Sequence, residues 1–190
     1  MIKQFVGSLL LSLLTCSAIA ATFDVAQLMA ELAKLKGGQA KFVEKKYISL
    51  LDKPIISTGE MSFTHPDQLE KRTLTPRTEI LRLDKELLSI EREKQKLTVN
   101  LNNQPEALAF IDSIRGTLTG NRAALEKNYR LHLSGTFEKW VLTLLPSDQK
   151  IAALVLRIEL SGNKSQIRRI EYLLADGDRS VMSLEPIERP

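Results

Sequence analysis

The sequence predicts a mainly β fold with helices, of the α+β class, in which about eleven short antiparallel strands form one curved sheet. Apolar and polar residues alternate with the period of a strand through most of residues 39–101 and again through 129–185. The breaks between these runs are too short for the crossover that parallel strands need. Residues 24–36 and 105–127 have the helical period instead. The chain of 190 residues is 43% hydrophobic and 26% charged, which suits one globular domain and argues against a disordered or collagen-like chain.

Residues 1–20 are typical of a targeting segment. Lys3 supplies the positive start, residues 5–14 form an apolar run too short to span a bilayer, and Ala18-Ile19-Ala20 is a small-x-small cleavage pattern. We therefore expect a signal peptide over residues 1–20 and a single domain over residues 21–190, exported to an oxidising compartment. An uncleaved anchor or a buried helix is the alternative interpretation.

Cys16 admits two interpretations. It faintly resembles the cysteine of a lipoprotein box, although Thr15 fits poorly just before it. Alternatively, Cys16 is removed with the signal peptide, which leaves a mature chain without cysteine, disulfide or thiol chemistry. Loss of Lys3 would also lower the formal net charge from +4 to +3, because 26 basic side chains would then face 23 acidic ones. Such a small excess does not by itself indicate nucleic acid.

The first helix of the expected domain has clear end signals. Asp24 is placed to cap its N-terminus, and Gln27 stands where a capping-box partner belongs. Phe23 can pack on Leu28, and Gly37-Gly38 is the expected stop. Its apolar residues share one face: Val25, Leu28, Met29, Leu32 and Leu35. This helix is therefore expected to lie on another element.

The strands are expected in two groups, separated by a helical insertion. Turn residues such as Asp52-Lys53-Pro54, His65-Pro66-Asp67 and Asp176-Gly177 separate neighbouring strands. The predicted strands are 39–49, 55–64, 68–74, 77–83, 86–93 and 95–101 before the insertion, and 129–135, 137–145, 152–160, 166–175 and 179–185 after it.

The insertion is predicted to form two short helices. Pro105 suits the first turn of one helix, and Gly116 ends it. Asn121 can cap the second, shorter helix. The apolar residues of the first recur with helical spacing: Ala107, Phe110, Ile111 and Ile114.

The predicted sheet has one apolar face and one polar face. A sheet of this kind tends to curl, and the predicted helices are few to cover its apolar face. Two outcomes stay open: an interior filled by side chains, as in a small barrel, or a concave aliphatic space. The apolar face carries Met61, Phe63, Leu81, Leu83, Leu88, Ile90, Leu97, Val99, Leu101, Leu131, Leu133, Leu154, Leu156, Ile158, Leu160, Ile170, Tyr172 and Leu174.

The stretch from Phe42 to Ile90, behind an amphipathic helix, resembles the periplasmic outer-membrane lipoprotein carrier family, the LolA-like proteins. The resemblance lies in the order and spacing of Phe42 and Glu44, Gly59-Glu60-Met61-Ser62-Phe63, Pro66 to Leu69, Pro76, and Leu81 to Leu87 before Leu88 to Ile90. It continues more loosely over the rest of the mature chain. Members typically have an Arg just before the first of these prolines, where it contacts the helical lid, whereas this chain has His65. The next strand, aromatic in typical members, is not aromatic here, which indicates a divergent relative whose cargo could be an envelope lipid other than a lipoprotein.

The resemblance implies an incomplete antiparallel β-barrel, closed over by the N-terminal helix and a helical lid, around a cavity that accepts acyl chains. It implies a periplasmic carrier, expected to be a monomer, that takes a lipoprotein or another envelope lipid from an inner-membrane transporter to an outer-membrane acceptor. The lid would consist of Phe110, Ile111 and Ile114, with His65 against it. The cavity wall would consist of Met61, Phe63, Leu81, Leu83, Leu88, Ile90, Leu97, Val99, Leu131, Leu133, Leu156, Ile158, Ile170 and Tyr172.

Other functions have weaker support in the sequence. It lacks the G-x-S-x-G and H-E-x-x-H motifs and a Gly-rich phosphate loop, and His65 and His132 lie far apart, so we expect neither an enzyme nor a metal or cofactor. Exposed aromatic platforms for nucleic acid are not evident. A non-transporting envelope scaffold stays an alternative, as does binding of anionic lipid head groups or a membrane partner. A basic face would consist of Lys45-Lys46, Lys71-Arg72, Arg77, Arg168-Arg169 and Arg179, although acidic residues interleave with it.

Overall fold

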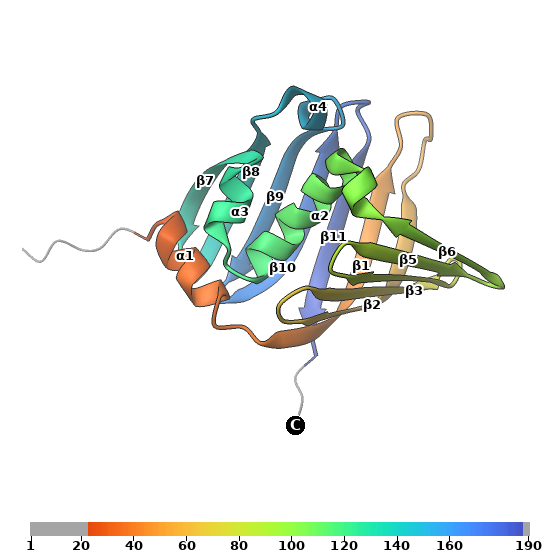
Figure 1. Ribbon diagram of the computed structural model, residues 1–190, viewed down its shortest axis with the longest axis horizontal. Coiled ribbons are helices and arrows are strands. Elements are labelled where there is room, and N and C mark those ends of the chain that lie inside the picture. Colours follow the sequence, from red (N-terminus) through yellow and green to blue (C-terminus); the bar gives the residue numbers. More distant parts are fainter. Residues whose placement is uncertain (1–22, 188–190) are drawn as a thin grey trace, which may run out of the picture.

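A computed structural model describes residues 23–187 of the chain. The predicted signal peptide over residues 1–20, with Cys16, lies outside these residues. The described part is one curved antiparallel sheet that does not close, with helices gathered on one of its sides (Figure 1). This confirms the predicted fold class, an incomplete barrel with helices.

The sheet consists of two meanders joined by the first and last strands. Its strand order is β6-β5-β4-β3-β2-β1-β11-β10-β9-β8-β7, so β6 and β7 are the two edges. All neighbours pair antiparallel, and β1 pairs with β11 from Ala40 opposite Pro186 to Tyr47 opposite Arg179. The strands are β1 (Gly37–Tyr47), β2 (Ile55–Thr64), β3 (Gln68–Thr75), β4 (Glu79–Asp84), β5 (Leu87–Arg92), β6 (Gln95–Asn100), β7 (Tyr129–Thr136), β8 (Lys139–Pro146), β9 (Val155–Asn163), β10 (Gln166–Leu174) and β11 (Arg179–Pro186).

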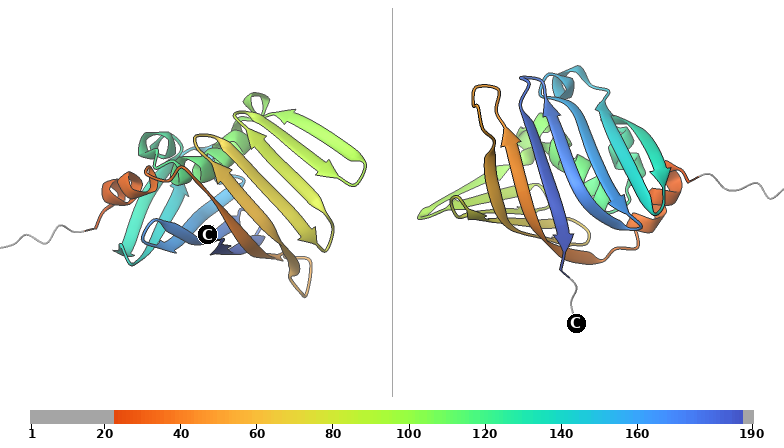
Figure 2. Two further views of the ribbon diagram at one scale, coloured as in Figure 1. Left: turned by 90° about the horizontal axis from the view of Figure 1, so that it is seen from below. Right: turned by 180° about the vertical axis from the view of Figure 1, so that it is seen from behind.

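The helical insertion crosses the mouth of the sheet because it must carry the chain from one edge strand to the other. It leaves β6, runs through η1 (Leu101–Asn103), α2 (Pro105–Leu118) and α3 (Arg122–Glu126), and enters β7. Figure 2 shows these helices and α1 (Val25–Leu32) on one side of the sheet, while its other side is bare. The topology therefore places α2 where a lid would be.

The predicted N-terminal signals of α1 are confirmed. The side chain of Asp24 accepts a hydrogen bond from the Gln27 backbone N–H at 2.8 Å, and Gln27 Oε1 accepts one from the Asp24 N–H at 3.3 Å. The helix ends earlier than its apolar stripe does. Leu35 N bonds to the carbonyl of Leu32 at 3.0 Å, a tight last turn, and Gly37 already belongs to β1.

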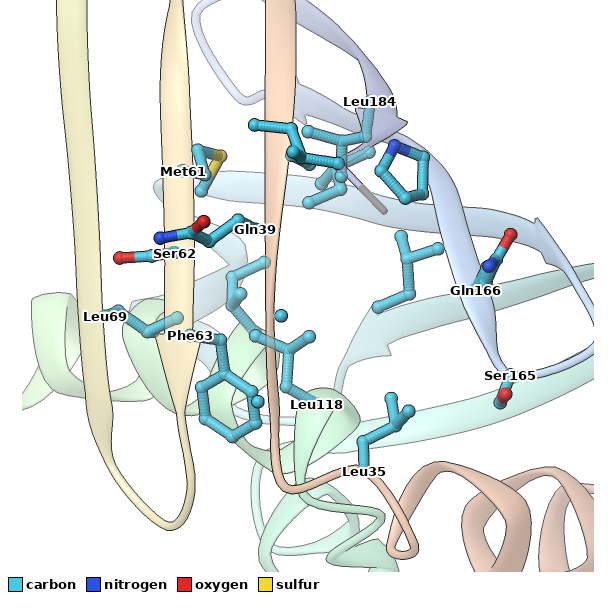
Figure 3. A pocket seen from close by; sticks show the side chains of 18 residues that line it. Leu35, Gln39, Met61, Ser62, Phe63, Leu69, Leu118, Ser165, Gln166 and Leu184 are labelled. Carbon is cyan, nitrogen blue, oxygen red and sulfur yellow. The ribbon is translucent and has the colours of Figure 1, made fainter. Parts of the chain in front are cut away.

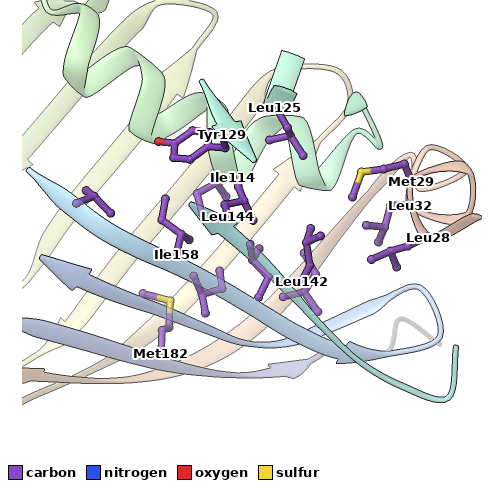
Figure 4. Close-up of a cluster of buried hydrophobic side chains, with 14 of the residues drawn as sticks. Leu28, Met29, Leu32, Ile114, Leu125, Tyr129, Leu142, Leu144, Ile158 and Met182 are labelled. Atoms are coloured by element: carbon purple, nitrogen blue, oxygen red, sulfur yellow. The ribbon is translucent and has the colours of Figure 1, made fainter. Parts of the chain in front are cut away.

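The helices divide the interior into a packed half and a looser half. On β7 to β11 they cover a dense core, part of which Figure 4 shows around Leu142, Leu144 and Ile158. These three residues, together with Trp140 and Leu160, are completely buried. On β2 to β6 most apolar side chains are partly buried or exposed. The two outcomes that the sequence left open are thus both present, each in one half of the molecule.

The region after β8 differs from the prediction. A four-residue helix, α4 (Gln149–Ala152), precedes β9, because Asp148 caps it by accepting from the backbone N–H groups of Lys150 at 2.8 Å and Ile151 at 3.2 Å. The strand consequently begins at Val155 rather than at residue 152. A register shift next to Leu174 then turns Val155 inward. Leu156, a predicted wall residue, is left 48% exposed.

Candidate functional site

Three hollows lie in a row along β1, β2 and β3, on the side of the sheet that faces the helices. The middle one lies under α2 and is called here the lid pocket. The apolar end pocket adjoins it near the start of β1, and the polar end pocket adjoins it near the end of β1. At about 3.3 Å per residue, the part of β1 from Gly38 to Lys46 spans roughly 26 Å. This exceeds half of the roughly 30 Å hydrocarbon thickness of a bilayer, which is the reach of one leaflet's acyl chains.

The lid pocket is walled mainly by apolar side chains from both the sheet and α2, with charged side chains at one end. Its volume is about 360 Å³, within the range of ligand sites. From the lid, Phe110, Ile111 and Ile114 point into it, and the ring of Phe110 lies 4.7 Å from that of Tyr172. Residues from the sheet complete it: Glu44, Lys46, Met61, Leu69, Glu70, Lys71, Leu81, Leu83, Leu88, Ile170, Tyr172, Leu174, Ser180 and Met182.

The apolar end pocket extends this surface toward the C-terminal end of α2. It has a volume of about 240 Å³. Figure 3 shows Phe63, Leu69, Leu118 and Leu184 around it. Met61, Leu69, Ile114 and Ile170 line both this pocket and the lid pocket, so the two are compartments of one apolar space.

The structure places half of the predicted wall residues around the three hollows and the other half elsewhere. Phe63 lines the apolar end pocket, while Ile158 belongs to the packed core and Leu131 and Leu133 pack against it. Leu97 lies on edge strand β6 and is 58% exposed. Ile90, Leu97, Val99 and Leu156 line none of the three hollows. The residues that do line the lid pocket are Met61, Leu81, Leu83, Leu88, Ile170 and Tyr172, together with all three lid residues.

Polar contacts hold the lid to the turn between β4 and β5. Arg115 of α2 donates from Nη1 to the carbonyl of Lys85 at 2.9 Å and from Nη2 to Asp112 at 2.5 Å. Its side chain is only 18% exposed. His65, the residue expected against the lid, lines a polar hollow together with Asp112 and Arg115. The arginine that fastens α2 to this turn is therefore on α2 itself, and its position was not predicted from the sequence.

We expect Arg115→Ala to loosen the lid without unfolding the sheet. Loss of the charged hydrogen bond to Lys85 should weaken closure by about 1 kcal/mol, or roughly fivefold in the rate of lipid loss. The rate can be measured by mixing protein loaded with a fluorescent fatty acid with excess vesicles. Arg122→Ala is the matched control, because Arg122 pairs with Glu126 inside α3. Equal rates of lipid loss for both variants would contradict the role of Arg115 in holding α2 closed.

The basic residues of the predicted surface face are largely neutralised. Glu171 accepts from both Arg169 at 2.6 Å and Arg179 at 3.5 Å, and Glu70 accepts from Arg72 and Arg82. The hydrogen bond from Arg82 is the main reason that the pKa of Glu70 lies below its usual value. These pairs break the expected basic face into small patches.

Within residues 23–187, no group of three His, Cys, Asp or Glu side chains is placed to hold a metal ion. In the same part of the chain, no helix has the length and apolarity to cross a bilayer.

A family model described as outer membrane lipoprotein carrier protein LolA-like matches residues 17–185. The chain belongs to this LolA-like family. The match confirms the resemblance seen between Phe42 and Ile90, and extends it over nearly the whole described chain. Membership indicates lipid or lipoprotein binding in a family of carriers and binding proteins rather than enzymes.

The solved structures to which this chain is similar are distant in sequence. A LolA superfamily protein from Nitrosomonas europaea is 10% identical, with a TM-score of 0.47, over 89% of this chain and 96% of that one. A putative outer membrane lipoprotein-sorting protein domain from Vibrio parahaemolyticus is 10% identical, with a TM-score of 0.43, over 87% and 93%. A chain of the MucA/MucB complex from Pseudomonas aeruginosa is 18% identical, with a TM-score of 0.45, over 88% of this chain but 59% of that one. No individually curated protein matches the chain.

Proposed function

We propose that this LolA-like protein is a periplasmic carrier that holds the acyl chains of a lipoprotein or another envelope lipid beneath α2. The lid pocket is the observation that carries the proposal, because it is a mainly apolar space of about 360 Å³ between the sheet and a helix. In this proposal the cargo comes from an inner-membrane transporter and goes to an outer-membrane acceptor.

Aliphatic walls suit a carrier because they bind hydrocarbon without fixing its position. Burial of acyl methylenes contributes about 0.8 kcal/mol each, so a bound chain needs comparable apolar surface in place of the membrane. Leu, Ile and Met make non-directional contacts that let a chain slide in and out.

The division of the interior supports reversible binding. Trp140 and its neighbours fill one half of the interior with packed side chains in the absence of cargo. Phe110 and Ile111 are only partly buried, and Arg115 fastens α2 near its C-terminal end. Partly buried side chains over a pocket can move aside at a lower free energy than side chains of the packed core.

Mass spectrometry of lipids that co-purify with protein isolated from its native envelope tests the proposal. We expect an acylated molecule in near-stoichiometric amount, and its transfer from inner-membrane to outer-membrane vesicles when the loaded protein is added. Protein that is reproducibly empty, and takes up no lipid from vesicles, would overturn the carrier and favour a scaffold.

A further inference from the structure

The wall of the lid pocket contains an ion pair that a purely hydrocarbon ligand does not require. Lys71 Nζ lies 2.5 Å from Glu44 Oε2, and Ser180 Oγ lies 2.7 Å from Glu44 Oε1. The side chains of Lys71 and Glu44 are 17% and 5% exposed. Removing two charges from water is costly, and a well-packed apolar pair would often be at least as stable. The pair is therefore better explained by binding than by stability.

The strand register determines that these charges face the lipid-binding side. Lys71 stands opposite Met61 on β2 and Leu81 on β4, and both of these line the lid pocket. Residues directly opposite in adjacent strands lie on the same face of a sheet. On β1, Glu44 lies two residues after the buried Phe42, so it shares that face.

An aromatic ring supports the ammonium of Lys71. Phe42 stands opposite Gly59, and a Cβ at Gly59 would lie 2.8 Å from the Phe42 ring. Only glycine leaves room for the ring there. Lys71 Nζ lies 5.0 Å from the centre of this ring, within reach of a cation–π contact.

The cluster has more positive than negative charge. Lys46 Nζ lies 3.8 Å from Glu44 Oε1, so two ammonium groups share one carboxylate. Burial alone would raise the pKa of Glu44, but Lys71, Ser180 and Lys46 outweigh it and hold that pKa below its usual value. Glu44 is therefore charged at neutral pH, and one positive charge stays uncompensated.

The excess charge continues into the polar end pocket, which has a volume of about 730 Å³. Glu44, Lys46 and Lys71 line both this pocket and the lid pocket. Arg92 pairs with Glu79, whereas Arg77 and Lys94 make no ion pair within residues 23–187. Five basic side chains face three carboxylates: Lys46, Lys71, Arg77, Arg92 and Lys94 against Glu44, Glu79 and Glu93.

We infer that the two connected pockets hold an anionic amphiphile, with its acyl chain in the lid pocket and its carboxylate or phosphate against Lys46 and Lys71. This inference rests on the proposed lipid-binding function and names the class of cargo. A negatively charged group at the boundary of the pockets meets two ammonium groups in a partly desolvated site, where charge-assisted hydrogen bonds are strong. Arg77 and Lys94 attract it from the polar side.

Three probes with the same alkyl chain test the inference: dodecanoate, dodecyl phosphate and dodecanol. Their affinities are measured by displacement of the neutral fluorophore N-phenyl-1-naphthylamine. We expect at least one anionic probe to bind about tenfold or more tighter than dodecanol, the equivalent of about 1.4 kcal/mol. A preference for dodecanoate points to a fatty-acid-like carboxylate, and a preference for dodecyl phosphate points to a phospholipid head group.

Two variants remove the positive charge without leaving Glu44 buried and unpaired. Lys46→Met removes the exposed ammonium and leaves the Lys71–Glu44 pair intact, whereas Lys46→Met combined with Glu44→Gln and Lys71→Met removes all three charges. Each should reduce the anionic preference to less than about threefold while dodecanol binds as before. Lys45→Met is the matched control, because Lys45 is exposed on the same strand and points the other way.

The outcomes separate the two proposals. Equal affinity of the wild-type protein for all three probes, or a preference that persists in both charge variants, would overturn the anionic site and leave lipid binding intact. Failure to bind any of the probes would count against the proposed function itself.

Discussion

Ile111→Glu should abolish the retention of bound lipid while the sheet stays folded. Ile111 lies on α2, lines the lid pocket between Phe110 and Ile114, and is partly buried. A carboxylate at this position must either give up its hydration or hold the lid open. Burial of an unpaired ion in an apolar site raises the free energy by several kcal/mol. A desolvation cost of about 3 kcal/mol corresponds to a loss of lipid affinity of roughly a hundredfold. The measurement is acyl lipid per protein, by mass spectrometry, after purification of both forms from the same envelope.

The matched control places the same charge elsewhere on the same helix. Ala107 is exposed and lines none of the pockets described, so Ala107→Glu should retain lipid as the wild type does. Thermal unfolding of both variants checks that they are equally folded. If Ile111→Glu retained a full complement of lipid, α2 would not be the lid.

Trp140→Ala should have the largest effect on stability. Trp140 is completely buried, and its Nε1 donates to the carbonyl of Lys164 at 2.8 Å. Its ring covers Gly162 on the neighbouring strand, where a Cβ would lie 2.6 Å from the ring. Removal of a buried aromatic ring typically lowers the free energy of unfolding by about 3–5 kcal/mol, a large part of the stability of a domain. Urea unfolding followed by circular dichroism measures the change.

Trp140→Phe separates packing from hydrogen bonding at the same position. It keeps a ring over Gly162 but removes the indole N–H, so the loss should fall to about 1–3 kcal/mol, mainly from the unpaired carbonyl of Lys164 and the smaller ring. A Trp140→Ala variant that lost less than about 1 kcal/mol would show that this half of the sheet is not the rigid part of the molecule.

The strands could be predicted because the alternation of apolar and polar residues along each one shows which of its faces is buried. Alternation from Met61 to Leu174 is a local property, and short turns allow only antiparallel neighbours. The helix α4 was missed because four residues are too few to show a helical period. Leu156 was misplaced because alternation assumes an unbroken strand, and a register shift at the start of β9 breaks it.

The division between core and pocket could not be predicted in the same way. Ile158 and Leu81 lie in strands with the same apolar and polar alternation. Helices nevertheless pack tightly over Ile158 and leave a pocket above Leu81. Which strands the helices cover depends on packing between segments far apart in the chain.

The position of Lys71 on the inner face of the sheet is predictable from the alternation along β3. Under Sequence analysis, Lys71 is placed together with Arg72 on a basic surface face. Its spacing of two residues from Leu69 and from the buried Thr73 places it on the inner face instead. A charged residue in phase with an apolar row is a signal that the sequence does contain.

The pairing of β1 with β11 has a consequence for how the molecule assembles. Each meander forms from contacts between neighbouring strands, but the seam between Ala40–Tyr47 and Arg179–Pro186 joins segments from opposite ends of the domain. Contacts between distant segments form slowly because the intervening chain must first be ordered. The seam includes Glu44, whose hydrogen-bond partner Ser180 is on β11. The charged boundary of the pockets is therefore completed only when β1 pairs with β11, so we expect the proposed ligand site to form late in folding.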